Sequence, residues 1–314
     1  MVAARQIEIL ISTYNGEEYL VEQLESIFAQ DINNWHILIR DDGSKDNSVL
    51  IIEDYASRYP DKITVIAEPP GRIGIPATYG YLLENSSSPY VAFCDQDDVW
   101  LPNKLRLLRE CIQQLEGGSE KGTPVLVHSD LHVVDNKLVK LADSFWKYQK
   151  INPSKMQFLE RLLLQNCVTG CATMVNRALL TRALPIPKDA ILHDWWLALF
   201  AASEGKIKEL SARTMEYRQH ADNTNGAKKW SSKHVLCRLL STRGWRENKF
   251  NLQSTIQQAL ALLEHGGIKD STRCVVKRYV DLYELNWFVK RVELIRYGYF
   301  KYGVIRNIGL FLLI

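Results

Sequence analysis

The chain has 314 residues, of which 46% are hydrophobic and 24% are charged, and this composition excludes a disordered or collagen-like protein. The length is sufficient for one large α/β domain with an appendage. The formal net charge of +3 is small for this length, which argues against a dedicated nucleic-acid-binding protein.

Short apolar runs alternate with segments of helical periodicity in the first part of the chain. Each run predicts a strand and the segment after it predicts a helix. In chain order the pairs are Ile7–Ser12 with Glu17–Ala29, Trp35–Ile39 with Asp46–Tyr59, Ile63–Ala67 with Pro76–Leu83, and Tyr90–Cys94 with Leu105–Leu115. Nearly continuous apolar runs are typical of parallel strands that helices cover on both faces. The sequence therefore predicts an α/β fold with a mainly parallel sheet flanked by helices.

The remainder of the chain alternates less regularly. The apolar patterns predict strands at Val125–Ser129, Cys171–Asn176 and Met215–Gln219, and helices at Met156–Leu164 and His193–Ser203. From about Trp230 onward the residues predict helices with basic faces, separated by Gly266 and Gly267. We therefore expect a domain over residues 1–226 that completes the sheet and a helical C-terminal extension over residues 227–314.

Polar residues follow three of the predicted strands. These segments are Ser12-Thr13-Tyr14-Asn15-Gly16, Arg40-Asp41-Asp42-Gly43-Ser44 and Asp95-Gln96-Asp97-Asp98. Because ligands bind outside the carboxyl ends of parallel strands, we expect the three segments to form one site. Crowded carboxylates repel one another unless a cation compensates them, so the Asp-x-Asp segment predicts a metal ion that holds a diphosphate. The alternative is a solvated turn in which Asp98 caps the helix that begins near Pro102.

In their order and spacing these three segments resemble the motifs of glycosyltransferase family 2, whose members have the GT-A fold. Two later segments, Leu192-His193-Asp194-Trp195-Trp196 and Tyr217-Arg218-Gln219-His220, are similar to the rhamnosyltransferase branch of that family. The resemblance covers roughly residues 6–226. It implies an inverting, metal-dependent transferase that moves L-rhamnose from dTDP-L-rhamnose to a polysaccharide or a lipid-linked oligosaccharide.

The resemblance assigns the nucleotide sugar to the first two segments. It places Ser12 and Tyr14 against the base and Asp42 on the imide N–H of the base. The chemistry agrees, because a carboxylate that accepts from this N–H selects uracil or thymine over cytosine, and an aromatic face supplies stacking. Alternatively, Asp42 caps the helix that begins near Lys45 and Tyr14 packs in a turn. Arg72 either clamps the diphosphate with two hydrogen bonds or is solvated.

The same resemblance assigns the metal site. Asp95 would contact the ribose or the metal, and Asp97 would bind the Mg²⁺ or Mn²⁺ that bridges the diphosphate. The ion would neutralise charge on the leaving nucleotide diphosphate. His220 matches the position of a further metal ligand in many enzymes of this fold, although a lone histidine is also common on protein surfaces.

The catalytic base is assigned to Asp194. The family places an aspartate for this role at the start of a helix, usually after glutamate, whereas His193 precedes it here and its role stays open. One base without a second carboxylate nucleophile implies direct displacement with inversion. Trp195 would offer a face to the acceptor sugar, and Trp196 is expected to pack in the core.

The C-terminal tail mixes aromatic, basic and apolar residues. Tyr297, Tyr299, Phe300 and Tyr302 alternate with Arg296, Lys301 and Arg306 ahead of the apolar stretch Leu310–Ile314. This pattern favours a helix in a membrane interface and equally a helix packed on the protein or a partner. The chain has no signal-peptide layout and no run of eighteen apolar residues, so we expect a cytoplasmic protein, at the inner face of the cell membrane if the tail binds lipid.

Three other functions are alternatives to this interpretation. A family 2 enzyme could transfer another hexose from a UDP-sugar. A nucleotidyltransferase also uses carboxylates and metal on a similar sheet, but it requires a glycine-rich phosphate loop with Lys or Arg after the first strand, which Ser12–Gly16 lacks. A non-catalytic sugar-binding protein would retain its function without the carboxylate of Asp194.

Overall fold

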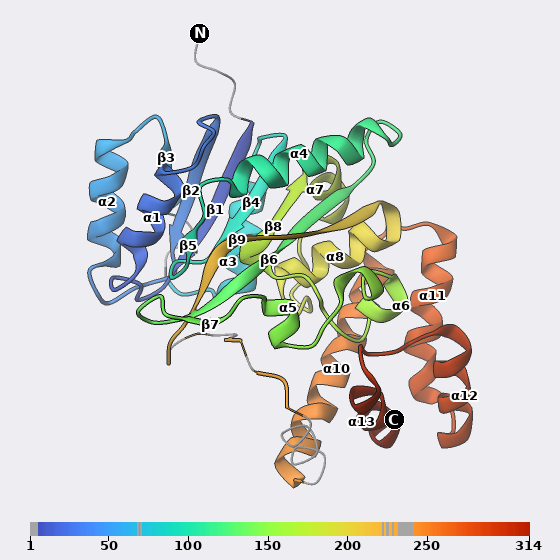
Figure 1. The fold of residues 1–314 in the computed structure, drawn as a ribbon. Helices are drawn as coiled ribbons and strands as arrows, with labels where there is room; N and C mark the ends of the chain where they lie inside the picture. The colour runs from blue at the N-terminus through green and yellow to red at the C-terminus, as the bar shows by residue number, and fades with distance from the viewer. Residues whose placement is uncertain are drawn as a thin grey trace.

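The computed structural model describes residues 6–314 except 68, 70, 222, 224, 225, 228 and 232–240. A nine-stranded sheet in the order β3-β2-β1-β4-β8-β6-β9-β5, with β7 paired to β6, forms the centre of the protein (Figure 1). Its strands are β1 (Ile7–Thr13), β2 (Trp35–Asp41), β3 (Ile63–Val65), β4 (Tyr90–Cys94), β5 (Val99–Trp100), β6 (Val125–Asp135), β7 (Lys140–Ala142), β8 (Thr173–Asn176) and β9 (Lys206–Gln219).

Helices pack around this sheet and extend beyond it at the C-terminus (Figure 1). They are α1 (Leu20–Phe28), α2 (Ser48–Arg58), α3 (Ile75–Glu84), α4 (Lys104–Gly117), α5 (Phe145–Tyr148), α6 (Leu159–Leu162), α7 (Arg177–Ala183), α8 (His193–Glu204), α10 (Thr242–His265), α11 (Asp270–Asp281), α12 (Trp287–Tyr297) and α13 (Val304–Leu313). The alternation of strand and helix predicted for the first part of the chain is confirmed.

The first half of the sheet is parallel. Strand β1 pairs with β2 and β4, and β2 pairs with β3, all in parallel. Strand β8 is antiparallel to both β4 and β6, whereas β6 and β9 are parallel. The carboxyl ends of β1, β2 and β4 therefore meet at one edge, which is the arrangement that the strand-end motifs require.

The side chains of β1 show why its apolar run is continuous. Ile7, Ile9 and Ile11 belong to a hydrophobic cluster that also contains Leu24 of α1, while Leu10 belongs to a second cluster. Successive residues of a strand point to opposite faces of the sheet. Both faces of β1 are therefore covered, as predicted.

Three predicted elements differ from the structure, and one of them is the strand expected at Val125–Ser129, which extends to Asp135 as β6. The helix expected at Met156–Leu164 is reduced to the short helix α6, preceded by a single 3₁₀ turn over Pro153–Lys155. Most of its apolar residues, including Met156 and Leu162, are buried although the segment is mainly a compact loop, whereas Phe158 is 57% exposed. The apolar spacing therefore reflected core contacts and not one continuous helix. Strand β9 is longer than expected because it runs along β6 from Lys206 to Gln219.

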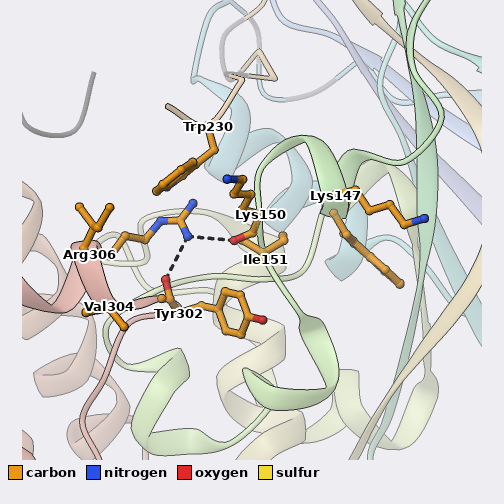
Figure 2. A pocket seen from close by; sticks show the side chains of 10 residues that line it. Lys147, Lys150, Ile151, Trp230, Tyr302, Val304 and Arg306 are labelled. Atoms are coloured by element: carbon orange, nitrogen blue, oxygen red, sulfur yellow. Dashed lines mark hydrogen bonds between the residues drawn. The ribbon is translucent and has the colours of Figure 1, made fainter. Parts of the chain in front are cut away.

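The C-terminal helices pack on the rest of the protein. Lys269 N–H donates to Glu204 Oε1 at 2.8 Å, which joins the start of α11 to the end of α8. At the start of α13, Arg306 Nη1 donates to Lys150 O at 2.9 Å (Figure 2). The helices expected from about Trp230 begin at Thr242 in the described part of the chain, and residues 232–240 lie outside the described residues.

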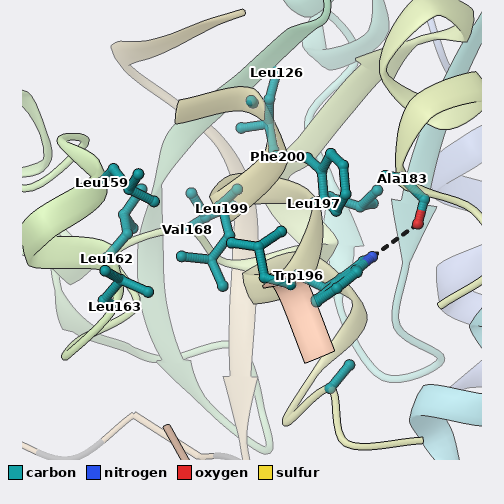
Figure 3. Close-up of a cluster of buried hydrophobic side chains, with 14 of the residues drawn as sticks. Leu126, Leu159, Leu162, Leu163, Val168, Ala183, Trp196, Leu197, Leu199 and Phe200 are labelled. Carbon is teal, nitrogen blue, oxygen red and sulfur yellow. Dashed lines mark hydrogen bonds between the residues drawn. The ribbon is translucent and has the colours of Figure 1, made fainter. Parts of the chain in front are cut away.

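Helix α8 lies in the larger hydrophobic cluster (Figure 3). Trp196 is fully buried, and its indole N–H donates to Ala183 O at 2.8 Å, which confirms that this tryptophan packs in the core. Leu262, Tyr279 and Tyr299 of the C-terminal extension belong to the same cluster. The extension thus shares its core with the helix that carries the predicted catalytic residue.

The tail packs through only one face. Tyr299 is fully buried and Leu310 is 2% exposed, whereas Val304 is 76% and Ile308 52% exposed. Among the residues that the structure describes, no helix has both the length and the apolar character needed to cross a membrane.

Candidate active site

A cavity of about 770 Å³ lies outside the carboxyl ends of β1, β2 and β4. Its lining includes eight residues that the sequence assigned to a site: Ser12, Tyr14, Asp42, Arg72, Asp95, Asp97, Asp194 and His220. They come from the end of β1, from separate loops and from the first turn of α8. Sequence-distant polar residues therefore share one cavity of the size that small ligands occupy.

Gln96 fixes the loop after β1. Tyr14 N–H donates to Gln96 Oε1 at 2.7 Å, and Gln96 Nε2 donates to Tyr14 O at 3.1 Å. The approach is so close that a Cβ on Gly16 would lie 2.5 Å from Gln96 Oε1. Sequence reasoning did not assign Gln96 a role, although its place between two aspartates at a strand end was a signal.

Asp42 is held by several donors. Its Oδ1 accepts from Arg40 Nη1 at 2.8 Å and from Ile73 N–H at 2.7 Å, and its Oδ2 accepts from Gly74 N–H at 2.9 Å. Burial alone would raise the pKa of Asp42, but the hydrogen bonds from Ile73 N–H and Arg40 outweigh burial and lower it. The carboxylate is therefore ionised at neutral pH. The N-cap of α2 is Asn47, so the alternative that Asp42 caps this helix is wrong.

Arg72 stacks on Tyr14. The guanidinium carbon lies 3.9 Å from the centroid of the Tyr14 ring, and both residues line the cavity. Such a contact is a cation–π interaction, and it covers one ring face of Tyr14. The arginine and the aromatic ring that were predicted to meet the nucleotide thus lie against each other.

Asp97 lies after the end of β4 and His220 directly after the end of β9, and their side chains form a pair. His220 Nε2 lies 2.8 Å from Asp97 Oδ2, and the imidazole also lies 4.8 Å from the Tyr19 ring. Arg218 Nε donates to the backbone carbonyl of Asp97 at 2.7 Å, and this hydrogen bond restrains the backbone of Asp97. The two side chains are hydrogen-bonded to each other, and a carboxylate with an imidazole is a donor set that suits Mn²⁺, while carboxylates suit Mg²⁺.

A second acidic group lies below this pair. Potential ligand atoms of Asp95, Asp98 and Cys171 all lie within 4.8 Å of one another. Burial, together with the charge of Asp97, raises the pKa of Asp95 to about 6. Burial and the charges of Asp97 and Asp95 raise the pKa of Asp98 well above its usual value. The carboxylates therefore need a proton or a cation to remain together.

Asp98 does not cap a helix. The N-cap of α4 is Asn103, while Asp98 is fully buried and its Oδ1 accepts from Arg218 N–H at 3.0 Å. The antiparallel pairing of β5 with β9 brings Arg218 to this position. The expected capping role was wrong because this long-range pairing cannot be inferred from local spacing.

Lys104 is a buried cation beside the acidic group. It is fully buried, its Nζ donates to Cys171 O, and the ammonium lies 3.9 Å from the centroid of the Trp100 ring. Burial lowers the pKa of Lys104 to about 8, although Asp98 and Asp95 act in the opposite direction. The lysine therefore carries its charge at neutral pH and offsets the neighbouring carboxylates.

Asp194 lies in the first turn of α8 and is 6% exposed. Its Oδ1 accepts from Trp195 N–H at 2.6 Å. Burial raises the pKa of Asp194 to about 7, the charge of Asp95 adds to the rise, and the hydrogen bond from Trp195 opposes it. A carboxylate of this kind can accept a proton near neutral pH, as a general base must.

His193 packs beneath Asp194. Its ring centroid lies 3.9 Å from that of Tyr79 and 4.9 Å from that of Phe93. Burial lowers the pKa of His193 to about 3, so the ring is neutral, and its nitrogens have no hydrogen-bond partner among the described residues. Gly170 permits the close packing, since a Cβ there would lie 3.0 Å from His193 Nε2.

Trp195 does not line the cavity with the other predicted residues. Its indole N–H donates to Leu162 O at 2.6 Å, and the ring packs against the larger hydrophobic cluster. The carbonyl of α6 thus holds this side chain in a position that the sequence did not reveal. Its assignment to the acceptor stays a prediction.

Curated relatives, among them the following two, align with most of this chain. An uncharacterized glycosyltransferase of Rickettsia conorii is 27% identical over 244 residues, which are 74% of this chain and 37% of that protein. The chain therefore spans well under half of that relative. The dTDP-rhamnosyl transferase RfbG of Shigella flexneri is 25% identical over 249 residues, which are 76% of this chain and 81% of RfbG.

The fold is shared with a protein of known structure. Residues 1–349 of Staphylococcus aureus TarS, in complex with UDP-GlcNAc, superpose with a TM-score of 0.54 and 16% sequence identity, over 94% of this chain and 89% of that one. The likeness confirms the predicted GT-A fold. The family model described as glycosyl transferase family 2 matches residues 8–182, which is more than half of the chain. On these grounds the protein belongs to glycosyl transferase family 2.

Proposed function

We propose that the protein is an inverting, metal-dependent glycosyltransferase whose nucleotide-sugar donor binds in the 770 Å³ cavity. The observation that carries this proposal is the convergence of Asp42, Asp97 and Asp194 on that single cavity from three separate parts of the chain. These residues provide, respectively, a base-recognising acceptor, a metal ligand and a proton acceptor. The family membership of the chain supports the same conclusion.

Asp194 acts as the general base in this proposal. It accepts the proton of the acceptor hydroxyl while the hydroxyl oxygen bonds to the anomeric carbon and the bond from that carbon to the diphosphate breaks. Attack from the face opposite the leaving group inverts the configuration. Its pKa of about 7 supports this role, because the residue is partly ionised at neutral pH and still basic enough to hold the proton.

Asp97 and His220 would hold Mg²⁺ or Mn²⁺, with Asp95 close by. The bound ion would supply charge neutralisation for the departing nucleoside diphosphate. The 2.8 Å separation of Asp97 Oδ2 from His220 Nε2 supports this assignment, since it brings two potential ligand atoms together in the lining of the cavity. Arg72 lies on the same cavity and can donate to the diphosphate oxygens.

The donor is proposed to be dTDP-L-rhamnose. Asp42 is an ionised acceptor beside Ser12 and Tyr14, which suits the imide N–H of thymine or uracil. The similarity to RfbG over most of both chains supports rhamnose as the sugar. The acceptor is proposed to be a polysaccharide or a lipid-linked oligosaccharide.

The proposal is tested by measuring nucleoside diphosphate release with Mn²⁺ from dTDP-rhamnose, UDP-glucose and UDP-GlcNAc. We expect the highest kcat/KM with dTDP-rhamnose. Turnover with a UDP-sugar but none with dTDP-rhamnose would remove the rhamnosyl assignment and identify a UDP-hexose transferase. Asp194→Asn should lower kcat by about 10²–10⁴-fold and leave donor binding intact, whereas Asp189→Asn, on the exposed loop before α8, should match wild type.

Full activity in Asp194→Asn would contradict the assignment of the base. A protein that binds the donors but releases no diphosphate with any acceptor would instead support a non-catalytic sugar-binding function. Chelation by EDTA should abolish release and added Mn²⁺ should restore it. Release that persists in EDTA would exclude a required metal.

The C-terminal tail is proposed to contact the membrane peripherally. Val304, Ile308 and Leu312 recur every four residues on α13 and are 76%, 52% and 56% exposed. This spacing makes one apolar stripe on the helix, which suits an interfacial position. Wild-type protein should float with phosphatidylglycerol-containing vesicles and Ile308→Asp should not; equal flotation of both would contradict the contact.

A further inference from the structure

A second cavity, of about 570 Å³, lies between the segment after β7 and the start of α13 (Figure 2). Its lining consists of Trp146, Lys147, Lys150, Ile151, Trp230, Tyr302, Gly303, Val304, Ile305 and Arg306. Ile151 lines both this cavity and the donor cavity, and Phe145 and Gln149 of the same segment line the donor cavity. One short segment of chain therefore separates the two cavities.

The second cavity is positively charged. Lys147, Lys150 and Arg306 belong to its lining, which contains no aspartate or glutamate. In the described ranges of the chain, no carboxylate lies within 4.0 Å of the charged groups of Lys150 or Arg306. Cations without a counterion in a concave, partly desolvated site favour an anionic ligand.

Backbone carbonyls hold Arg306 in place. Its Nη1 donates to Lys150 O at 2.9 Å and to Tyr302 O at 3.0 Å (Figure 2). Its Nη2 donates to Gln149 O at 2.6 Å. The guanidinium is half-buried, so its orientation is restricted. Among the described residues these neutral acceptors take three of the five guanidinium N–H groups, and they leave the charge without compensation.

Lys150 is held in an uncommon backbone conformation. Its φ of 47° lies in the left-handed region, which is unfavourable for a non-glycine residue. Its ammonium lies 4.2 Å from the centroid of the Trp230 ring, and the Arg306 guanidinium carbon lies 5.8 Å from the same ring. The indole thus positions both cations on one side of the cavity.

Two tryptophans of the lining contain buried indole N–H groups without partners in the described part of the chain. The indole nitrogens of Trp146, which is 9% exposed, and of Trp230 have no hydrogen-bond partner within the described residues. A buried N–H normally has an acceptor. These nitrogens are closed off from solvent, so the uncompensated cations are what suits the cavity to a ligand with several anionic oxygens.

We propose that the second cavity is the acceptor subsite and that it binds a sugar joined to a phosphate or diphosphate group. The role as an acceptor subsite rests on the proposed transferase function, whereas the binding of a sugar phosphate does not. Lys150 and Arg306 bind the phosphate, and the aromatic walls contact the sugar. The shared wall at Ile151 places a sugar bound here beside the donor cavity. The exposed apolar stripe of α13 begins at Val304, in the lining of the cavity, so a lipid on the phosphate has an adjoining apolar surface.

Calorimetric titration of the full chain in EDTA tests the binding chemistry. The probes are glucose 1-phosphate, glucose and inorganic phosphate. We expect glucose 1-phosphate to bind, and Lys150→Gln to weaken this binding by about tenfold because a charge-assisted hydrogen bond is lost. Lys121→Gln, which removes an exposed lysine outside both cavities, should bind like wild type.

The location is tested with Asp97→Asn, which alters the donor cavity alone. Loss of glucose 1-phosphate binding in Lys150→Gln but not in Asp97→Asn supports the second cavity. Equal loss in both variants, or no loss in Lys150→Gln, overturns the assignment. Inorganic phosphate that binds as tightly as glucose 1-phosphate also overturns it, because the site would then recognise only an anion.

Transfer kinetics separate this inference from the proposed function. With octyl-diphosphate-linked glucose as acceptor, Lys150→Gln should raise the acceptor KM about tenfold without changing the donor KM. With octyl glucoside, which lacks phosphate, the variant should match wild type. An unchanged acceptor KM in an active enzyme overturns the acceptor subsite alone. Absence of transfer from every donor overturns the proposed function, and the titrations then still decide whether the cavity binds a sugar phosphate.

Discussion

Asp194 is nearly excluded from solvent, and this burial should be visible in the pH dependence of the reaction. Its pKa is raised to about 7, so the ionised base becomes abundant only as the pH rises through that value. We expect kcat/KM to increase with pH up to about 7 and then to level off. A profile of initial rates between pH 5 and 9 measures this. An acid limb near the ordinary pKa of an aspartate would contradict the role of burial.

Lys104 should be important for stability because it is a cation enclosed with carboxylates. Removing one partner from a buried charged group leaves the others uncompensated. We expect Lys104→Met to lower the free energy of unfolding by roughly 3 kcal/mol at pH 7, where the lysine is charged. Urea denaturation provides the measurement. The exposed Lys121→Met should change it by less than about 0.5 kcal/mol; similar values for both would contradict the buried network.

The sequence predicted those site residues that belong to strand-end motifs. Asp42, Asp97 and Asp194 could be assigned because their motifs follow recognisable strands or begin a helix, and the structure places all three on one cavity. Lys104 was missed because a lysine at the start of an amphipathic helix normally faces water. Trp195 was assigned to the acceptor because nothing in the local sequence reveals its hydrogen bond to Leu162 O.

At the scale of elements, continuous apolar runs predicted β1, β2 and β4 well because both faces of these strands are buried. The short elements β5 and β7 were not predicted, since two or three residues carry no usable periodicity. The position of β9 beside β6 also depends on pairing between distant segments. Such pairing decides where Arg218 and His220 lie, so the local sequence could indicate these residues but not their partners.

The junction between α8 and β9 should tolerate no side chain at Gly205. A Cβ at this position would lie 2.0 Å from Pro124 O, the carbonyl that accepts from Lys206 N–H. We expect Gly205→Ala to lower the free energy of unfolding by about 2–3 kcal/mol, because the backbone of β9 must shift. Thermal unfolding checks this.

Gly117 provides the matched control for Gly205. It is the last residue of α4, and a Cβ there would meet nothing within 4 Å. Gly117→Ala should therefore be neutral or stabilise the protein by less than about 1 kcal/mol. Equal destabilisation by the two substitutions would show that the contact with Pro124 O is not the cause.

At the scale of the whole molecule, the C-terminal helices and the sheet domain share one hydrophobic cluster. Leu310 of α13 is 2% exposed within this cluster, whereas Ile308 on the same helix is 52% exposed. We expect Leu310→Ala to lower the free energy of unfolding by about 2–4 kcal/mol and Ile308→Ala by less than about 0.5 kcal/mol. Urea denaturation of the two variants compares them. Equal small effects would mean that α13 does not pack on the protein.

Composition and pattern predicted one large α/β unit with a helical extension, but not how the extension attaches. The tail pattern was equally compatible with a membrane interface and with packing on protein. The structure shows why both alternatives were open: Tyr299 and Leu310 face the core, while Val304 and Ile308 face outward. A helix with two apolar faces gives no periodic signal that distinguishes them.

The way Asp42 is fastened has a consequence for redesign of nucleotide preference. Its carboxylate holds Arg40 and the amides of Ile73 and Gly74, so it is a structural anchor of the neighbouring loop as well as the proposed reader of the base. A substitution of Asp42 would remove the hydrogen bonds that hold the loop at Ile73 and Gly74, in addition to any effect on recognition of the base. Engineering the enzyme toward cytidine or guanosine donors would therefore require redesign of the whole loop together with Arg40, because a single substitution at Asp42 would not be sufficient.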